Sequence, residues 1–196
     1  MSRNFSENTL AAIFVMDTEG ASLSEQLLDA ARRNNLDLVE TVFDSLDNDP
    51  EKIAKLINES REPLGNTALH LCCKYGSWEV LDKILDQDGG IEIDPQNDVD
   101  GDTPLHVTVK YSQEEPEHGT FIARNLIEVG ADPRIKNYNN QKPIDLVHGD
   151  ELDELIDLLQ GAELAIDSNN GLADKDESEE IIDDGPSDDD EDDDKN

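Results

Sequence analysis

One six-residue pattern occurs twice in this chain and constrains its fold more than any other feature. Residues 65–70 (GNTALH) and 101–106 (GDTPLH) both read G-x-T-x-L-H, and the two copies lie 36 positions apart. Each copy is followed in the same register by a Lys-Tyr pair, at 74–75 and 110–111. A long motif with a period in the thirties is typical of stacked-repeat proteins. Because such stacks mainly present extended surfaces, the pattern favours binding over catalysis.

Start and stop signals place further helices before the first copy. Residues 22–25 (SLSE) fit a capping box, and residues 49–50 (DP) fit an N-cap followed by proline at the first helical position. Apolar residues recur at helical spacing over 27–46, with a break at 34–35 (NN) that predicts two short antiparallel helices. A further short helix is expected after residue 50.

The two motif copies predict inner helices over 67–75 and 103–111, each followed by a second apolar helix, over 78–86 and 121–129. The segment 112–120 between the later pair is about six residues longer than its counterpart and contains Glu, Pro and Gly. This composition predicts an exposed loop.

A weaker unit follows at 140–160, and Gly161 predicts the end of its last helix. Beyond Ser168 the chain is too rich in acidic and polar residues to bury a core, which predicts disorder. We therefore expect a flexible leader over 1–21, a repeat domain over 22–162 with units near 22–60, 61–97, 98–137 and 138–162, and a disordered acidic tail over 163–196.

The chain is strongly acidic. Its 196 residues carry a formal net charge of −34 at pH 7, of which −12 lies in residues 171–196 and −22 in the rest. A field of this sign repels nucleic acid and anionic membranes and attracts basic proteins. Selection for solubility alone would give the same excess of acidic residues. The charge therefore indicates a basic kind of partner and does not identify the partner.

Two other features bear on the compartment of the protein. Cys72 and Cys73 are adjacent and cannot form a normal structural disulfide, which favours a reducing compartment. The apolar run 10–16 is too short to span a bilayer and sits at the short limit for a signal peptide, so a leader or a peptide that packs on the first repeat is the favoured interpretation.

The units resemble the ankyrin repeat. Residues 103–106 (TPLH) and 130–132 (GAD) match the family pattern directly, and residues 67–70 (TALH) match it with alanine in place of proline. The resemblance covers about 23–162, with degenerate end units, as expected of capping repeats. It implies an all-α solenoid of three to four helix-turn-helix repeats with hairpin loops. One fungal group in the family has an acidic C-terminal extension and escorts a basic ribosomal protein.

The resemblance also implies structural roles for the histidines and cysteines that could otherwise suggest a metal site or catalysis. His70 and Cys73 lie three apart on one helix, as a metal site would require, but the family pattern implies that His70 ties neighbouring turns together. His106 takes the same structural role, and the cysteines fill small buried positions. We expect no enzyme activity, catalytic residue, metal or cofactor.

Partner-binding candidates lie just beyond the motifs. The pairs Lys74-Tyr75 and Lys110-Tyr111 are expected side by side in the groove, either as a ladder of cations and phenols or as solvated helix ends. If Trp78 is exposed, it is a candidate hot spot for partner binding; if it is half-buried, its role is to pack against neighbouring residues. The hairpin tips, where family members usually contact partners, are expected at 61–64, 98–100 with Asp100, and 137–139 with Tyr138.

These observations predict a monomeric, non-enzymatic binding protein in the cytoplasm, with the nucleus as a further site. The favoured hypothesis is escort of a basic protein, such as a ribosomal one, without direct contact with nucleic acid or membrane. The alternative is a general adaptor whose tail serves solubility, or autoinhibits by lying over Lys74 and Lys110. Ser187, followed by four acidic residues, is a candidate phosphorylation site for an acid-directed kinase.

Overall fold

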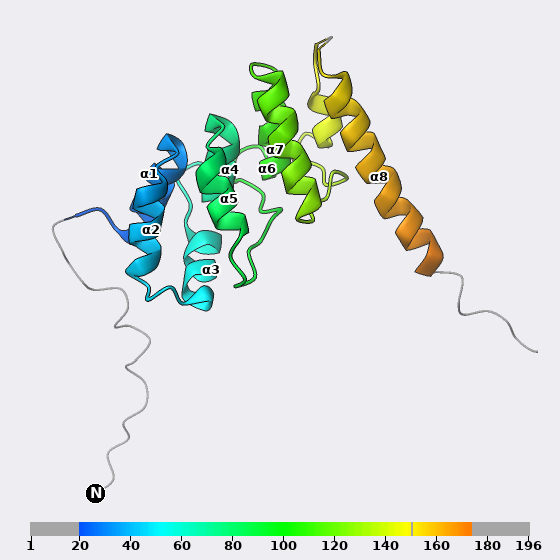
Figure 1. Ribbon diagram of the computed structural model, residues 1–196. Coiled ribbons are helices and arrows are strands. Elements are labelled where there is room, and N and C mark those ends of the chain that lie inside the picture. Colours follow the sequence, from blue (N-terminus) through cyan, green and yellow to red (C-terminus); the bar gives the residue numbers. More distant parts are fainter. Residues whose placement is uncertain (1–19, 150, 174–196) are drawn as a thin grey trace, which may run out of the picture. The chain divides into compact units, whose positions relative to one another are not determined.

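The computed structural model describes residues 20–149 and 151–173 of the chain. Over these residues it contains α-helices, one short 3₁₀-helix and no strand (Figure 1). The elements, in chain order, are α1 (Leu23–Arg33), α2 (Leu36–Asp44), α3 (Pro50–Glu59), α4 (Ala68–Tyr75), α5 (Trp78–Leu85), α6 (Pro104–Ser112), α7 (Pro116–Glu128), η1 (Pro143–Leu146) and α8 (Asp153–Ala173). The fold is therefore an all-α repeat solenoid, as predicted.

The first helices begin and end where the local chemistry of the sequence predicts. Ser22 caps α1 in a capping box with Glu25, whose carboxylate accepts a hydrogen bond from the Ser22 backbone N–H at 2.8 Å. Asn34 ends α1 in the left-handed conformation, with φ of 52°, and Asn35 caps α2. Asp49 caps α3, with Pro50 at the first helical position. These three predictions are confirmed.

Helices pair within each repeat, and the inner helices then stack. The pairs are α1 with α2, α4 with α5, and α6 with α7, and contacts run from α1 to α4 to α6 to η1. The core lies between these layers and includes leucines that are almost wholly buried, among them Leu27, Leu69, Leu81, Leu105 and Leu126. Because no repeat can bury its apolar face alone, each depends on its neighbours.

Helix α3 occupies the connection between the first and second repeats. A hairpin closed by the Arg61–Thr67 bridge follows it, and the later connections have a hairpin without such a helix. The segment after α5 packs on α3: a Cβ at Gly89 would overlap the carbonyl of Pro50. The Asn58 side chain donates to the Gly90 carbonyl at 3.1 Å and accepts from the Glu92 N–H at 3.0 Å. This helix therefore braces the segment that follows α5.

The prediction of an exposed loop over 112–120 is wrong for most of that segment. Helix α7 begins at Pro116, five residues before the predicted start, and Gly119 and Thr120 are buried. Proline suits the first turn of a helix because its fixed φ matches and its missing N–H is not needed there. A Cβ at Gly119 would overlap the Cβ of Ser112, so glycine lets the added turn lie close against α6.

The fourth unit departs from the sequence prediction at both ends. Its first element is the short 3₁₀-helix η1, and α8 continues through Gly161 to Ala173, so the predicted stop at Gly161 is wrong. A glycine inside a helix costs only about 1 kcal/mol relative to alanine. The residues after it (AELA) are good helix formers and carry the helix past it.

A compact unit ends at Glu163, within α8, and the residues from 164 onward belong to a second unit. In that second part the Ser168 hydroxyl donates to the Leu164 carbonyl at 2.8 Å. Residues 1–19 of the predicted leader (1–21) and residues 174–196 of the predicted tail (163–196), with Ser187, lie outside the described residues. The predicted domain and repeat boundaries stay predictions. Among the described helices, none combines the length and the apolar character that crossing a membrane requires.

Candidate functional site

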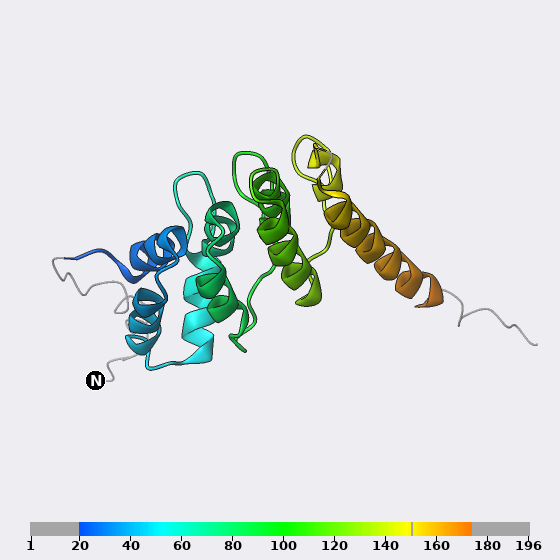
Figure 2. The same cartoon turned by 45° about the horizontal axis from the view of Figure 1, so that its top comes forward.

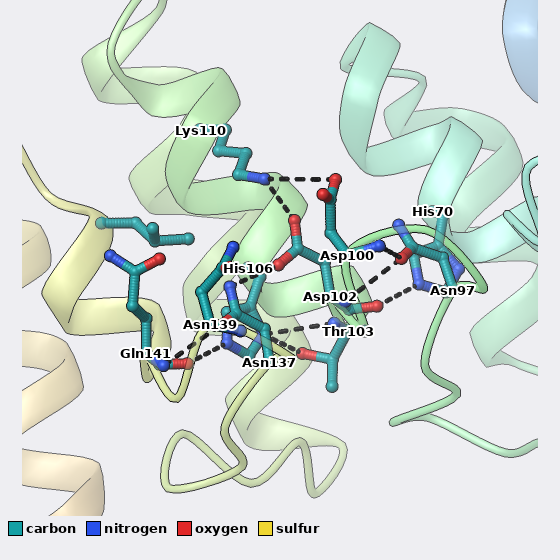
Figure 3. Close-up of polar contacts among 12 residues, drawn as sticks. His70, Asn97, Asp100, Asp102, Thr103, His106, Lys110, Asn137, Asn139 and Gln141 are labelled. Carbon is teal, nitrogen blue, oxygen red and sulfur yellow. Dashed lines mark hydrogen bonds and ion pairs between the residues drawn. The ribbon is translucent and has the colours of Figure 1, made fainter.

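The two motif histidines tie each inner helix to the next hairpin. At the start of α4, the Nδ1 atom of His70 accepts from the Thr67 N–H at 3.2 Å and lies 2.9 Å from the Thr67 hydroxyl, while Nε2 lies 2.9 Å from the Asp102 carbonyl. His106 repeats this arrangement with Thr103, at 3.2 and 2.9 Å, and with the Gln141 carbonyl at 3.0 Å (Figure 3). Each ring is therefore neutral, with the proton on Nε2.

Burial makes these groups poor candidates for chemistry. It lowers the pKa of His70 to about 4 and that of His106 in the same direction. Cys72 and Cys73 are wholly buried, and burial raises the pKa of Cys73 to about 12, so it behaves as a small apolar side chain. Within residues 20–149 and 151–173, no group of three His, Cys, Asp or Glu residues is arranged to hold a metal ion.

Asp102 connects three consecutive hairpins. Its carboxylate is almost wholly buried, accepts from the Asn137 side-chain amide at 2.8 Å and pairs with Lys110. Its backbone N–H donates to the Asn97 side-chain oxygen at 3.2 Å, and the Asn97 amide donates in turn to the Asn66 side chain at 3.0 Å. Figure 3 shows Asp102 among Asn97, Asn137 and Lys110.

Asp102→Ala is expected to lower the free energy of unfolding by about 2 kcal/mol, because it leaves the buried Asn137 amide without an acceptor. Asp102→Asn keeps an oxygen for that amide and loses only the ion pair with the half-exposed Lys110, so it is expected to cost about 1 kcal/mol. Urea unfolding followed by circular dichroism measures both. Equal losses in the two variants would contradict a role for the Asn137 contact.

The hairpins form a row at one edge of the stack, and each tip exposes one large apolar residue. The exposed fractions are 53% for Leu64, 58% for Val99 and 65% for Tyr138. We call these three residues the hairpin-tip ridge. Figure 2 shows the three connecting loops projecting side by side. The tips are joined by backbone hydrogen bonds, from the Asp98 N–H to the Leu64 carbonyl at 3.2 Å and from the Tyr138 N–H to the Asp100 carbonyl at 2.8 Å.

The two predicted Lys-Tyr pairs have different environments. Lys74 is exposed, its Nζ lies 5.5 Å from the centroid of the Tyr75 ring, and Tyr75 is 49% exposed. Lys110 instead pairs with Asp102 and lies 4.0 Å from Asp100. The first pair is therefore open to a partner, and the second is held by acidic residues of its own hairpin.

The aromatic residues of the second and third repeats come together away from the hairpins. Tyr111 is half-buried and its hydroxyl lies 3.0 Å from His118 Nδ1. Trp78, also half-buried, packs edge-on against Phe121 with ring centroids 4.6 Å apart. The structure thus favours packing for Trp78. Sequence reasoning misses Phe121 and His118, because the sequence predicts a loop where the first turns of α7 lie.

Comparison with known proteins gives the family. A model of ankyrin repeats (3 copies) matches residues 27–137. The chain is 91% identical over 180 residues to the ankyrin repeat-containing protein YGL242C of Saccharomyces cerevisiae, an alignment that covers 92% of this chain and 99% of that protein. It is also 38% identical over 56 residues to oxysterol-binding protein-related protein 1 of Rattus norvegicus, covering 29% of this chain and 5% of that protein. The chain therefore belongs to the ankyrin-repeat family, whose repeats are protein-interaction modules.

Proposed function

We propose that this protein binds a basic protein through the hairpin-tip ridge and escorts it, without catalysing a reaction. The observation that carries the proposal is the ridge itself, in which three consecutive tips each expose a large apolar side chain. Monomeric proteins expose single apolar residues often, but an aligned series on adjoining turns is characteristic of an interface. Tyr138 adds a rigid ring with a polar end, a side chain that interfaces favour.

Charge indicates the kind of partner. The apolar tips are interspersed with acidic side chains, of which Asp98 is exposed and Asp100 half-exposed. The Arg61 guanidinium is occupied by the carbonyls of Gly65 and Gln96, at 3.0 and 3.1 Å, and is less available to an incoming acid. With a net charge of −34 on the whole chain, the surface attracts a basic partner and speeds its encounter.

Escort is the role that follows from such binding. A basic protein that is covered by an acidic surface is kept from nonspecific contact with nucleic acid, since both compete for the same positive charges. Residues 171–196 add a net charge of −12 to the attraction that a basic partner experiences. We place this activity in the cytoplasm, with the nucleus as a further site.

The double variant Leu64→Ala, Val99→Ala is expected to reduce recovery of the partner about tenfold in affinity purification, because it removes two exposed anchors and leaves the core intact. Purification with the full chain as bait, at low and at moderate salt, is followed by mass spectrometry. We expect basic proteins whose yield falls with salt and with the double variant. Leu164→Ala, equally exposed on α8, is the control and is expected to change nothing. Recovery that is insensitive to both salt and the variant would overturn the proposal.

Deletion of residues 174–196 separates escort from the adaptor alternative. Escort predicts partner binding that is weaker and less sensitive to salt, whereas an adaptor with a solubilising tail keeps its affinity. Stronger binding after the deletion would instead support autoinhibition by the tail. Each result is measured on the partner recovered with the full chain.

A further inference from the structure

The insertion between α6 and α7 builds a row of four aromatic rings at the junction of the second and third repeats. Tyr111 and His118 have centroids 5.8 Å apart and meet edge to face, and His118 stacks on Phe121 at 6.4 Å. Phe121 in turn meets Trp78, across the junction, at 4.6 Å with an interplanar angle of 71°. We call these four residues the junction patch.

The patch exists because the added turn of α7 reaches back over the preceding repeat. His118 lies in this turn, which the second repeat lacks. A Cβ at Gly76 would overlap the Tyr111 hydroxyl and lie 3.2 Å from His118, so the two rings cover the turn between α4 and α5. The patch therefore lies at the C-terminal end of α4, whereas the hairpin contacts of α4 are made at its N-terminal end.

The patch is accessible and is bordered by negative charge. Phe121 is 42% exposed, although it is a large apolar residue. The exposed carboxylates of Glu114 and Glu115 lie close enough to Tyr111 to contribute to a raised pKa of its hydroxyl, after burial. Glu79 lies near His118 and also accepts a hydrogen bond from the Asn34 amide. In the described part of the chain, none of these three glutamates forms an ion pair with a lysine or arginine.

We propose that the junction patch is a second docking surface and that its occupant is an arginine-rich segment of a partner. A guanidinium stacks on an aromatic face more readily than an ammonium does, and it pairs with carboxylates through two parallel hydrogen bonds. Within the row Phe121 offers exposed aromatic surface, and beside Tyr111 the exposed Glu114 and Glu115 offer the carboxylates. The inference rests on the proposed function only in taking the partner to be basic.

The chain carries its own reporter for this site. Trp78 is its single tryptophan and lies in the patch against Phe121, so its fluorescence reports binding there and not at the hairpin tips. The probe is a nine-residue polyarginine peptide, titrated into the full chain at physiological salt, with nine-residue polylysine for comparison. We expect polyarginine to change the fluorescence of Trp78, and polylysine to change it less.

Variants test whether the patch is responsible for the response. Phe121→Ala is expected to weaken the binding that Trp78 reports about fivefold, through loss of the stacking face. The double variant Glu114→Gln, Glu115→Gln is expected to weaken it similarly without altering the rings. Val129→Ala, which removes an equally exposed side chain just after α7, and the ridge variant Leu64→Ala, Val99→Ala are expected to leave it unchanged.

Two results with polyarginine would overturn the proposal. One is calorimetric binding of polyarginine with no response from Trp78, which would place the peptide elsewhere on the acidic chain. The other is an equal response in the Glu114, Glu115 variant and the unchanged chain. If a basic partner binds the ridge and the fluorescence of Trp78 does not change, the docking proposal for the junction patch fails and the proposed function stands. If polyarginine changes the fluorescence of Trp78 but no basic partner is recovered, the proposed function fails and the docking proposal stands.

Discussion

Gly65→Ala is expected to lower the free energy of unfolding by about 4 kcal/mol. Gly65 has a φ of +79°, where a side chain costs about 1 kcal/mol or more. A Cβ there would also overlap the backbone nitrogen and the carboxyl group of Asp98 in the next hairpin. Because the backbone of Asp98 donates to the Leu64 carbonyl, the two hairpins would have to separate and lose that contact. Urea unfolding followed by circular dichroism measures the loss.

Gly90→Ala is the matched control. Gly90 has nearly the same backbone conformation, with a φ of +82°, but nothing lies within 4 Å of the added Cβ. Its expected cost is therefore the conformational part alone, about 1 kcal/mol. If the two variants lost equal stability, the close approach of neighbouring hairpins would have no energetic weight.

Acidification is expected to destabilise the stack through His70. Its pKa is about 4 in the folded chain and is expected near 6.5 in the unfolded chain, so between these values the unfolded state binds a proton that the folded state does not. The stability that the neutral ring supplies is complete above pH 6.5 and falls as the pH falls. The expected loss is about 2 kcal/mol at pH 5 and about 3 kcal/mol at pH 4. Protonation of Nδ1 would also break its bond with the Thr67 N–H.

A comparison with His70→Gln isolates this contribution from that of the many carboxylates, which both chains share. Urea unfolding from pH 7 to pH 5 stays clear of the pI of about 4.1. The original chain is expected to lose more stability over this range than the variant does. The imidazole signals of His70, followed by NMR, should remain those of a neutral ring in the folded chain down to pH 5 and titrate near pH 6.5 in urea. A constant stability difference between the two chains would show that His70 accepts its proton without unfolding.

Local signals predicted the helices well because their causes are local. The capping box at Ser22, the Asn34 break and the Asp49 cap each act within a few residues. The errors at 112–120 and at Gly161 have a different origin. Whether an added turn packs depends on the close fit of Gly119 against Ser112, and whether a helix passes a glycine depends on the residues that follow. Neither the packing of an added turn nor the combined helix propensity of the following residues can be read from the presence of Gly, Pro and Glu in a segment.

The candidate site was predictable in part for the same reason. The tips at 61–64, 98–100 and 137–139 follow from the repeat, which places Tyr138 on the ridge, and Tyr75 is exposed as a binding residue should be. Lys110 differs from Lys74 because it pairs with Asp100 and Asp102. These contacts form only when the hairpin is folded, so the sequence motif does not reveal them. Phe121 could have been found only by treating the insertion as a helix whose first residue is Pro116.

The insertion also has a mechanical consequence for the stack. The second and third repeats are fastened at one end of α4 by the Asp98–Leu64 and His70–Asp102 hydrogen bonds, and at the other end by the rings of Trp78 and Phe121. A joint that is held at both ends resists bending as well as sliding. These two repeats therefore form a stiff central pair, and a partner that binds either end of α4 meets a surface whose shape is already set.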